Sequence, residues 1–114
     1  MIDLMRRRLC GAGILLLATA FVLLGNATAF AEIATVTIDN FTFKPAMLTL
    51  KRGSTVTFVN HDDIPHSIVD SGGKFRSKVL DTNESFNITL DADGNVTYFC
   101  GLHPHMTGRI VVTP

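Results

Sequence analysis

The sequence has little cysteine, two residues in 114, and it has no surplus of either charge. Ten Lys/Arg and ten Asp/Glu give a formal net charge of zero. A chain without a basic surplus has little with which to neutralise a phosphate backbone, which disfavours nucleic-acid binding. The sequence also lacks a glycine-rich phosphate loop and any ten-residue stretch with helical periodicity and caps. The chain of 114 residues is also too short for a Rossmann or TIM-barrel enzyme domain, and its length indicates one small domain.

We interpret residues 1–31 as a secretory signal peptide. Arg6, Arg7 and Arg8 form a cationic start, residues 9–31 contain no charged side chain, and Ala29-Phe30-Ala31 has the small-x-small pattern of a cleavage site. We expect cleavage after Ala31 and export to the periplasm, which leaves a single domain over residues 32–114. Because an uncharged stretch of this length is also long enough to span a bilayer, the alternative is an anchor that is retained.

Residues 32–114 keep one cysteine, Cys100, and a net formal charge of −2 from seven Lys/Arg and nine Asp/Glu. A single cysteine cannot close an intramolecular disulfide. Cys100 is therefore a buried inert thiol, a reactive thiol or a metal ligand, and its neighbours must decide among these.

Alternation of apolar and polar residues recurs along residues 32–114 and predicts short strands. We expect strands near residues 33–38, 47–50, 55–59, 67–69, 86–90, 96–99 and 109–112. The dipeptide Asp93-Gly94 is a signal for a tight hairpin between the two strands beside it. The pattern indicates an all-β, antiparallel sandwich of about seven to eight strands.

The segment that carries chemistry is Cys-Gly-Leu-His-Pro-His-Met, residues 100–106, directly after a predicted strand. Cys100, His103 and Met106 offer a thiolate, an imidazole and a thioether within seven residues, and His66 lies far upstream at the start of another strand. Soft sulfur ligands favour copper, and imidazole suits it as well. Two histidines, one cysteine and a weak axial methionine form the blue-copper electron-transfer set.

Each of these residues also has a simpler interpretation. Taken alone, Cys100 is a small buried hydrophobe, Met106 is a core side chain and His66 is a surface histidine. An alternative metal site consists of Cys100, His103 and His105, which together would suit Zn(II). His105 on its own would suit an exposed secondary copper site.

The same residues resemble the cupredoxin family, and within it most closely the amicyanins. The resemblance runs from about residue 34 to 112, and the Cys-x-x-His-x-x-Met spacing is that of the amicyanins. It rests on Phe43, Pro45, Leu48, Gly53, Val56-Thr57-Phe58, Asn60, Pro65-His66, Tyr98-Phe99-Cys100, His103-Pro104, Met106, Gly108 and Ile110-Val111-Val112. It implies a Greek-key β-sandwich that binds one type 1 copper ion, with His66, Cys100 and His103 as strong ligands and Met106 as the axial ligand.

Three positions depart from the family's usual pattern. Ser67 follows the first histidine where an Asn often ties the two ligand loops together, and we expect the serine to bond across the same gap. Leu102 replaces a proline, and its restored backbone N–H is a candidate donor to the Cys100 sulfur. His105 replaces an aromatic ring. We interpret Asp62-Asp63 as part of a solvated loop rather than as a second metal site.

We therefore expect a monomeric, periplasmic carrier that shuttles single electrons and is not itself an enzyme. The resemblance implies that electrons leave through His103 to redox partner proteins, such as a dehydrogenase or a c-type cytochrome. One alternative is a copper-trafficking or storage protein of the same fold without a redox partner. Another is a piece of a multicopper oxidase, although the chain is too short to hold a trinuclear centre.

Overall fold

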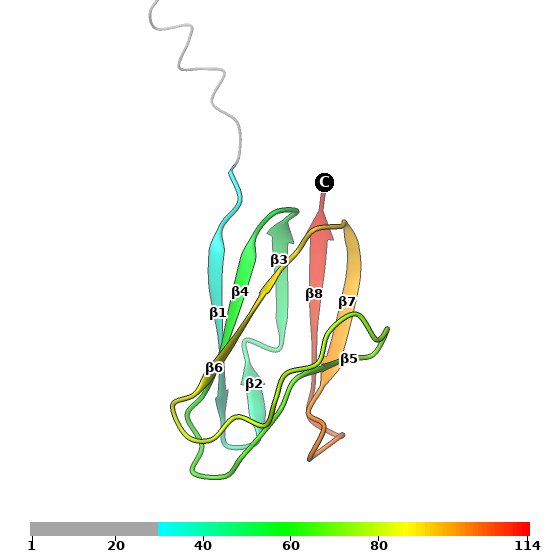
Figure 1. The fold of residues 1–114 in the computed structure, drawn as a ribbon. Helices are drawn as coiled ribbons and strands as arrows, with labels where there is room; N and C mark the ends of the chain where they lie inside the picture. The colour runs from blue at the N-terminus through cyan, green and yellow to red at the C-terminus, as the bar shows by residue number, and fades with distance from the viewer. Residues whose placement is uncertain (1–29) are drawn as a thin grey trace, which may run out of the picture.

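A computed structural model describes residues 30–114 (Figure 1). All but the last two residues of the expected signal peptide lie outside the described residues, and no helix in the described part could cross a membrane. The described chain forms eight strands, β1 (Ile33–Asp39), β2 (Thr42–Lys44), β3 (Met47–Lys51), β4 (Thr55–Asn60), β5 (Val69–Asp70), β6 (Ser85–Thr89), β7 (Gly94–Phe99) and β8 (Thr107–Thr113).

The strands build two four-stranded sheets, which confirms the predicted all-β sandwich (Figure 1). One sheet has the order β2-β1-β4-β6, and the other has the order β3-β8-β7-β5. The expectation of a wholly antiparallel sandwich is wrong, because β1 pairs with β4 in parallel and β3 pairs with β8 in parallel. Strands paired in parallel cannot be joined by a tight turn, so these pairings bring together segments separated by whole intervening strands.

The turn at Asp93-Gly94 does not close the predicted hairpin. β6 belongs to the first sheet and β7 to the second, so this turn carries the chain from one sheet to the other (Figure 1). Gly94 has a φ of 127°, a backbone conformation that residues with a side chain rarely adopt. The sequence thus located a real turn, but the strand partners on its two sides were decided by distant residues.

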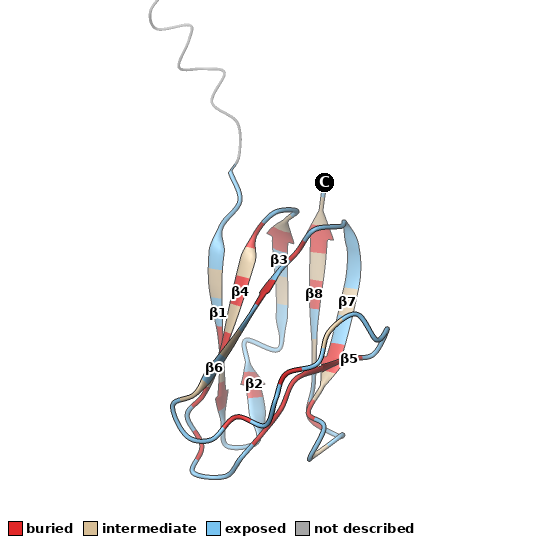
Figure 2. Ribbon diagram, in the orientation of Figure 1, coloured by how far each residue is buried: buried red, intermediate tan, exposed pale blue. Residues whose placement is uncertain are grey.

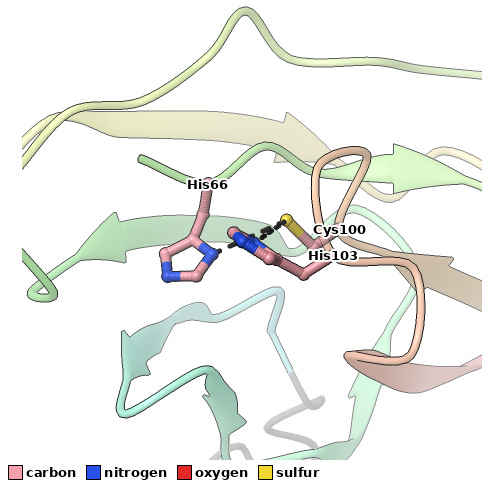
Figure 3. Close-up of side chains that lie close together, drawn as sticks. All are labelled: His66, Cys100 and His103. Carbon is pink, nitrogen blue, oxygen red and sulfur yellow. Dashed lines mark hydrogen bonds between the residues drawn. The ribbon is translucent and has the colours of Figure 1, made fainter. Parts of the chain in front are cut away.

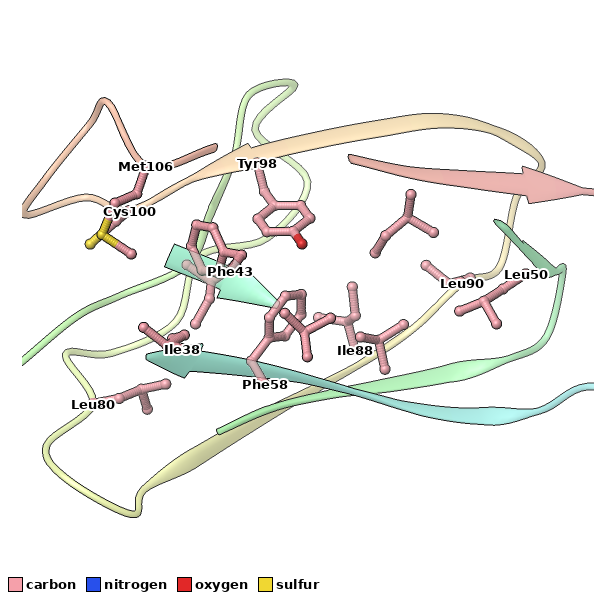
Figure 4. Close-up of a cluster of buried hydrophobic side chains, with 14 of the residues drawn as sticks. Ile38, Phe43, Leu50, Phe58, Leu80, Ile88, Leu90, Tyr98, Cys100 and Met106 are labelled. Atoms are coloured by element: carbon pink, nitrogen blue, oxygen red, sulfur yellow. The ribbon is translucent and has the colours of Figure 1, made fainter. Parts of the chain in front are cut away.

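Alternate side chains from the facing strands fill the space between the sheets, which produces the alternating burial seen in Figure 2. Three aromatic rings occupy its middle (Figure 4). Phe43 and Phe58 each contact Tyr98 edge to face, with ring centroids 4.9 and 5.2 Å apart. This geometry is favourable for aromatic pairs and fastens β2 and β4 of one sheet to β7 of the other.

Both predicted ligand segments lie at one end of this sandwich, after β4 and after β7. The first segment is held by Asn60, which is fully buried at the end of β4. The Asn60 side-chain amide donates to the carbonyls of Ile64 and Leu80, at 3.0 Å each, and its oxygen accepts from the Asp62 N–H at 2.9 Å. A buried amide with all these partners fixes the path of the loop that leads to His66.

Candidate metal centre

The His66 side chain is fully buried, and its backbone is fixed on both sides. The His66 N–H donates to the Leu80 carbonyl at 3.1 Å, and the Leu80 N–H donates back to the His66 carbonyl at 2.7 Å. These two bonds form an isolated antiparallel bridge outside the eight strands. The backbone that carries the His66 imidazole is therefore held in place by sheet-like hydrogen bonds.

The loop after β7 curls back on itself. The Cys100 N–H donates to the Met106 carbonyl at 3.1 Å, and the Met106 N–H donates to the His103 carbonyl at 2.9 Å. These two bonds bring three residues of the predicted ligand set into one compact turn. Cys100 and Met106 are buried, whereas His103 is half-buried.

Two imidazole nitrogens converge on one thiol in this end of the sandwich (Figure 3). His66 Nδ1 lies 3.6 Å from Cys100 Sγ, and His103 Nδ1 lies 3.8 Å from it. The ligand atoms of the three residues all lie within 4.8 Å of one another. The structure thus brings together His66 and the Cys100 loop across more than thirty residues of sequence.

This arrangement fits one bound metal ion. A metal about 2.0 Å from nitrogen and about 2.3 Å from sulfur, at a trigonal angle, separates the two donors by about 3.7 Å. The two observed separations, 3.6 and 3.8 Å, lie on either side of that value. With one thiolate, two imidazoles and a neighbouring thioether, the donor set suits copper better than a harder cation.

Asp62 fixes the tautomer of His66. Its carboxylate Oδ2 lies 2.8 Å from His66 Nε2. An ionised carboxylate accepts hydrogen bonds and donates none, so Nε2 carries the proton and Nδ1 keeps its lone pair for a metal. The interpretation of Asp62 as a solvated loop residue is therefore wrong, because it is buried, whereas Asp63 beside it is exposed. The spacing of four residues between Asp62 and His66 was the signal in the sequence that could have revealed the pair.

The charge on Asp62 is stabilised by the backbone around it. Burial pushes the pKa of the Asp62 carboxyl upward, but hydrogen bonds from the Phe41 and Asn40 N–H groups and pairing with His66 outweigh this effect. The result is a pKa below its ordinary value. The carboxylate is thus ionised at neutral pH and able to orient the imidazole.

Ser67 ties the two ligand loops together, as expected for the residue in the place of an Asn. Its Oγ accepts a hydrogen bond from the Gly101 N–H at 3.0 Å, and its own N–H donates to Cys100 Sγ at 3.4 Å. The donor that the structure places on the sulfur is thus the Ser67 N–H, not the Leu102 N–H that the sequence suggested. A hydrogen bond of this kind stabilises negative charge on the thiolate.

His105 stays outside the cluster. Among residues 30–114, the His, Cys and carboxylate groups close enough to hold a metal are His66, Cys100 and His103. The exposed His105 ring is 6.5 Å from the His103 ring, between centroids. The alternative site of Cys100, His103 and His105 is therefore not the one that the fold assembles.

Comparisons with known proteins agree with this fold. The family model for the cupredoxin-like domain matches residues 13–112. Amicyanin from Paracoccus versutus is 30% identical over 87 residues, which cover 72% of this chain and 66% of that protein. The structure of a purple cupredoxin from Nitrosopumilus maritimus has a TM-score of 0.64 at 29% identity, and the match covers 70% of this chain and 99% of that one.

A copper-containing nitrite reductase from Thermus scotoductus also has this fold, with a TM-score of 0.67 and 30% identity. The match covers 78% of this chain but only 24% of the reductase chain. The fold and the site define a copper-binding β-sandwich protein. The chain belongs to the cupredoxin-like family, it resembles the amicyanins most, and its cofactor is one copper ion.

Proposed function

We propose that this protein is a type 1 copper electron carrier. In this proposal His66, Cys100 and His103 are the strong ligands, and Met106 is the weak axial ligand. The observation that carries it is the convergence of two imidazole nitrogens on one buried thiol, at 3.6 and 3.8 Å from Sγ. Histidine, cysteine and methionine in this combination are the donors of electron-transfer copper sites.

The protein's own part is to keep these donors in place. Bound copper supplies one-electron chemistry by alternating between Cu(II) and Cu(I). Asp62 orients the His66 ring, and Ser67 bonds to both the sulfur and the loop that bears it. Because the donors are already held by the fold, little of the chain has to move when the charge at the site changes, which favours fast electron exchange.

The burial of the site favours a carrier over a copper-trafficking or storage protein. His66 and Cys100 are both fully buried, and the half-buried His103 offers the exposed edge among the three strong donors. Handing a metal to another protein requires an incoming ligand to reach it, which burial hinders. Electron transfer requires only contact with the exposed edge of one ligand.

The surface around His103 suits a protein partner. Exposed apolar side chains lie on the neighbouring segments, with Leu102 45%, Phe41 38% and Ile64 37% exposed. Apolar side chains clustered at a surface are typical of protein interaction sites. In our proposal a redox partner, of the dehydrogenase or c-type cytochrome kind, docks on this face and exchanges electrons through His103.

Residues 1–31 complete the proposal as a cleaved signal peptide that sends the domain of residues 32–114 to the periplasm, where it acts as a monomer. The amino-terminal arginines, the uncharged run and the Ala-x-Ala pattern support this assignment. Mass determination of the protein recovered from the periplasm tests it. A mass that starts at Glu32 is expected, and a full-length, membrane-bound chain would contradict both cleavage and release.

The visible absorption spectrum of the purified protein after addition of Cu(II) tests the ligand set. We expect an intense blue thiolate-to-copper charge-transfer band that is lost in Cys100→Ala. The chain's four histidines allow matched controls. His66→Ala and His103→Ala should abolish or strongly alter the band, whereas His61→Ala and His105→Ala should leave it unchanged. A pale band that survives Cys100→Ala would overturn the proposal.

The electron self-exchange rate separates the carrier from the trafficking protein. A carrier exchanges electrons rapidly between its Cu(II) and Cu(I) forms and gives up copper slowly to a soluble chelator. Slow self-exchange combined with rapid copper loss would favour the trafficking or storage function. The visible absorption spectrum recorded after addition of Cu(II) also distinguishes a copper protein from a zinc protein, since a protein that retains Zn(II) and excludes copper gives no visible band.

A further inference from the structure

The β1–β2 turn has an unusual backbone. Asp39 pairs with Thr42, so two residues, Asn40 and Phe41, form the turn. Their φ angles are 54° and 57°, both in the left-handed region. Two-residue turns of this kind favour glycine at the second position, and a bulky side chain is disfavoured there because its Cβ crowds the backbone. The phenylalanine therefore stands where the turn alone would favour glycine.

The turn is anchored to the metal centre by a single carboxylate. Asp62 Oδ1 accepts from the Asn40 N–H at 2.6 Å, and Oδ2 accepts from the Phe41 N–H at 2.9 Å. The same Oδ2 lies 2.8 Å from His66 Nε2. The backbone conformation of the turn and the orientation of the His66 ring are thus coupled through Asp62.

The anchored turn places the Phe41 ring against both imidazoles. Its centroid lies 5.4 Å from that of His66 and 5.0 Å from that of His103, with interplanar angles of 88° and 87°. The two imidazoles are themselves 5.1 Å apart. The three rings form one cluster, in which Phe41 meets each imidazole in the favourable edge-to-face arrangement.

The two imidazoles differ in how else they are held. His66 is buried and bonded to Asp62, whereas His103 is half-buried. Within residues 30–114, the only side-chain hydrogen-bonding partner of the His103 ring is Cys100 Sγ, on the metal-facing nitrogen. The orientation of the His103 ring therefore depends on packing, and Phe41 supplies an edge-to-face contact at its flank.

We propose that Phe41 is a positioning residue of the copper site, which limits rotation of the His103 ring so that Nδ1 keeps facing Cys100 Sγ. The purpose of this positioning rests on the proposed function, but the contacts between the rings are those of the metal-free chain. The inference gives the left-handed phenylalanine a role, because the turn that disfavours a bulky side chain is also the turn that places this ring against both imidazoles.

The test compares three variants with the unaltered protein. Phe41→Leu keeps an apolar side chain with a Cβ at the same backbone position, but removes the ring. Phe41→Tyr restores a ring. Asn40→Gly puts a glycine at the neighbouring left-handed position and leaves Phe41 in place. It therefore controls for effects of a change in the backbone of the turn.

The first readout is proton NMR of the metal-free protein. Nuclear Overhauser contacts from Phe41 to His66 and His103 are expected, together with one sharp set of His103 ring resonances. In Phe41→Leu both imidazoles lose the ring current of Phe41, so the resonances of both should shift, but only those of His103 should also broaden. Phe41→Tyr and Asn40→Gly should keep the original pattern.

The second readout is the rate of copper loss to a chelator, with the visible and electron paramagnetic resonance spectra. Loss of an aromatic contact predicts about two- to tenfold faster copper loss in Phe41→Leu, with rescue in Phe41→Tyr. His103 resonances that stay sharp and copper loss that stays unchanged in Phe41→Leu would overturn the inference, and so would an equal effect of Asn40→Gly. Absence of the blue band in the unaltered protein would contradict the proposed function instead, and the NMR comparison would still decide the role of Phe41.

Discussion

Asp62 and His66 form a buried carboxylate–imidazole pair, with Oδ2 2.8 Å from Nε2. The carboxylate holds both the His66 ring and the β1–β2 turn, because it also accepts hydrogen bonds from the N–H groups of Asn40 and Phe41. A residue four positions before His66 therefore joins a hairpin of one sheet to the candidate metal centre. Because Nε2 is engaged by Asp62, Nδ1 is the His66 nitrogen that faces Cys100 Sγ.

Asp62→Asn tests this double role. An asparagine side chain keeps the shape but loses the charge and half of the accepting capacity, so the turn and His66 Nε2 compete for one oxygen. We expect about 10- to 100-fold weaker copper binding, as is usual for a lost partner of a metal-bound histidine. We also expect about 1–3 kcal/mol less stability, from a buried N–H left without an acceptor.

Chelator competition measures the copper affinity, and urea unfolding of the metal-free protein measures the stability. The matched control is Asp63→Asn, since Asp63 is the exposed neighbour in the same loop. Equal effects of the two substitutions would mean that only the net charge of the loop matters.

Ser67 and Gly101 are expected to be energetically coupled. A Cβ added at Gly101 would lie 2.6 Å from Ser67 Oγ and 3.2 Å from Val69 Cγ2. Gly101→Ala should therefore destabilise the protein by about 1–3 kcal/mol, as overpacking does. Ser67→Ala removes the closer contact, so Gly101→Ala should cost less in that background.

A double-mutant cycle on the free energy of unfolding measures the coupling, which should reach about 0.5 kcal/mol or more for side chains in contact. Additive effects would show that the loops do not meet through these two residues. Gly72→Ala is the control, because a Cβ there makes only ordinary contacts, the nearest 3.5 Å from Asp70.

Tyr98 has a buried hydroxyl for which residues 30–114 supply no hydrogen-bond partner. Removing an unpaired buried polar group eliminates its desolvation cost, so Tyr98→Phe should stabilise the protein by about 1 kcal/mol at neutral pH. Thermal or urea unfolding measures the change. A clear loss of stability would mean that the hydroxyl has a partner, such as an ordered water.

The same burial predicts a pH dependence in alkali. Desolvation raises the pKa of Tyr98 above its ordinary value of 10.0, so the folded protein holds this proton more tightly than the unfolded chain. The unfolded chain then binds fewer protons above pH 10, and stability falls as the pH rises past that point. The difference between the unaltered protein and Tyr98→Phe isolates this effect, because other groups titrate equally in both. A difference that stays constant from pH 8 to pH 11 would contradict it.

Gly108 is the residue on β8 that pairs directly with Tyr98 on β7. A Cβ at Gly108 would collide with the ring and the hydroxyl of Tyr98. The Tyr98 ring lies in the core between the sheets (Figure 4). Gly108→Ala should therefore lower the free energy of unfolding by about 1–3 kcal/mol or more. The near-ultraviolet circular dichroism signal of the aromatic cluster around Tyr98 should change as well. Normal stability and an unchanged spectrum would show that the ring has room to move.

The fold class and most of the candidate metal centre are predictable from the sequence. Alternation of apolar and polar residues depends on local backbone geometry, so seven of the eight strands are predictable without knowing their partners. The three-residue β2 is too short to show the alternation and was not predicted. The short spacing of Cys100, His103 and Met106 after a strand made their association a local property as well. The family resemblance placed His66 beside them, and the structure brings its ring to the sulfur.

Tertiary structure alone decided the pairing of strands and the surroundings of the ligands. The parallel pairs β1–β4 and β3–β8 and the crossing from β6 to β7 depend on how distant strands bury their apolar faces together, which no local turn dictates. The same is true of Phe41 and Asp62. A charged loop residue becomes a buried partner of His66, and a turn phenylalanine reaches two imidazoles, only when three separate segments meet at one end of the sandwich.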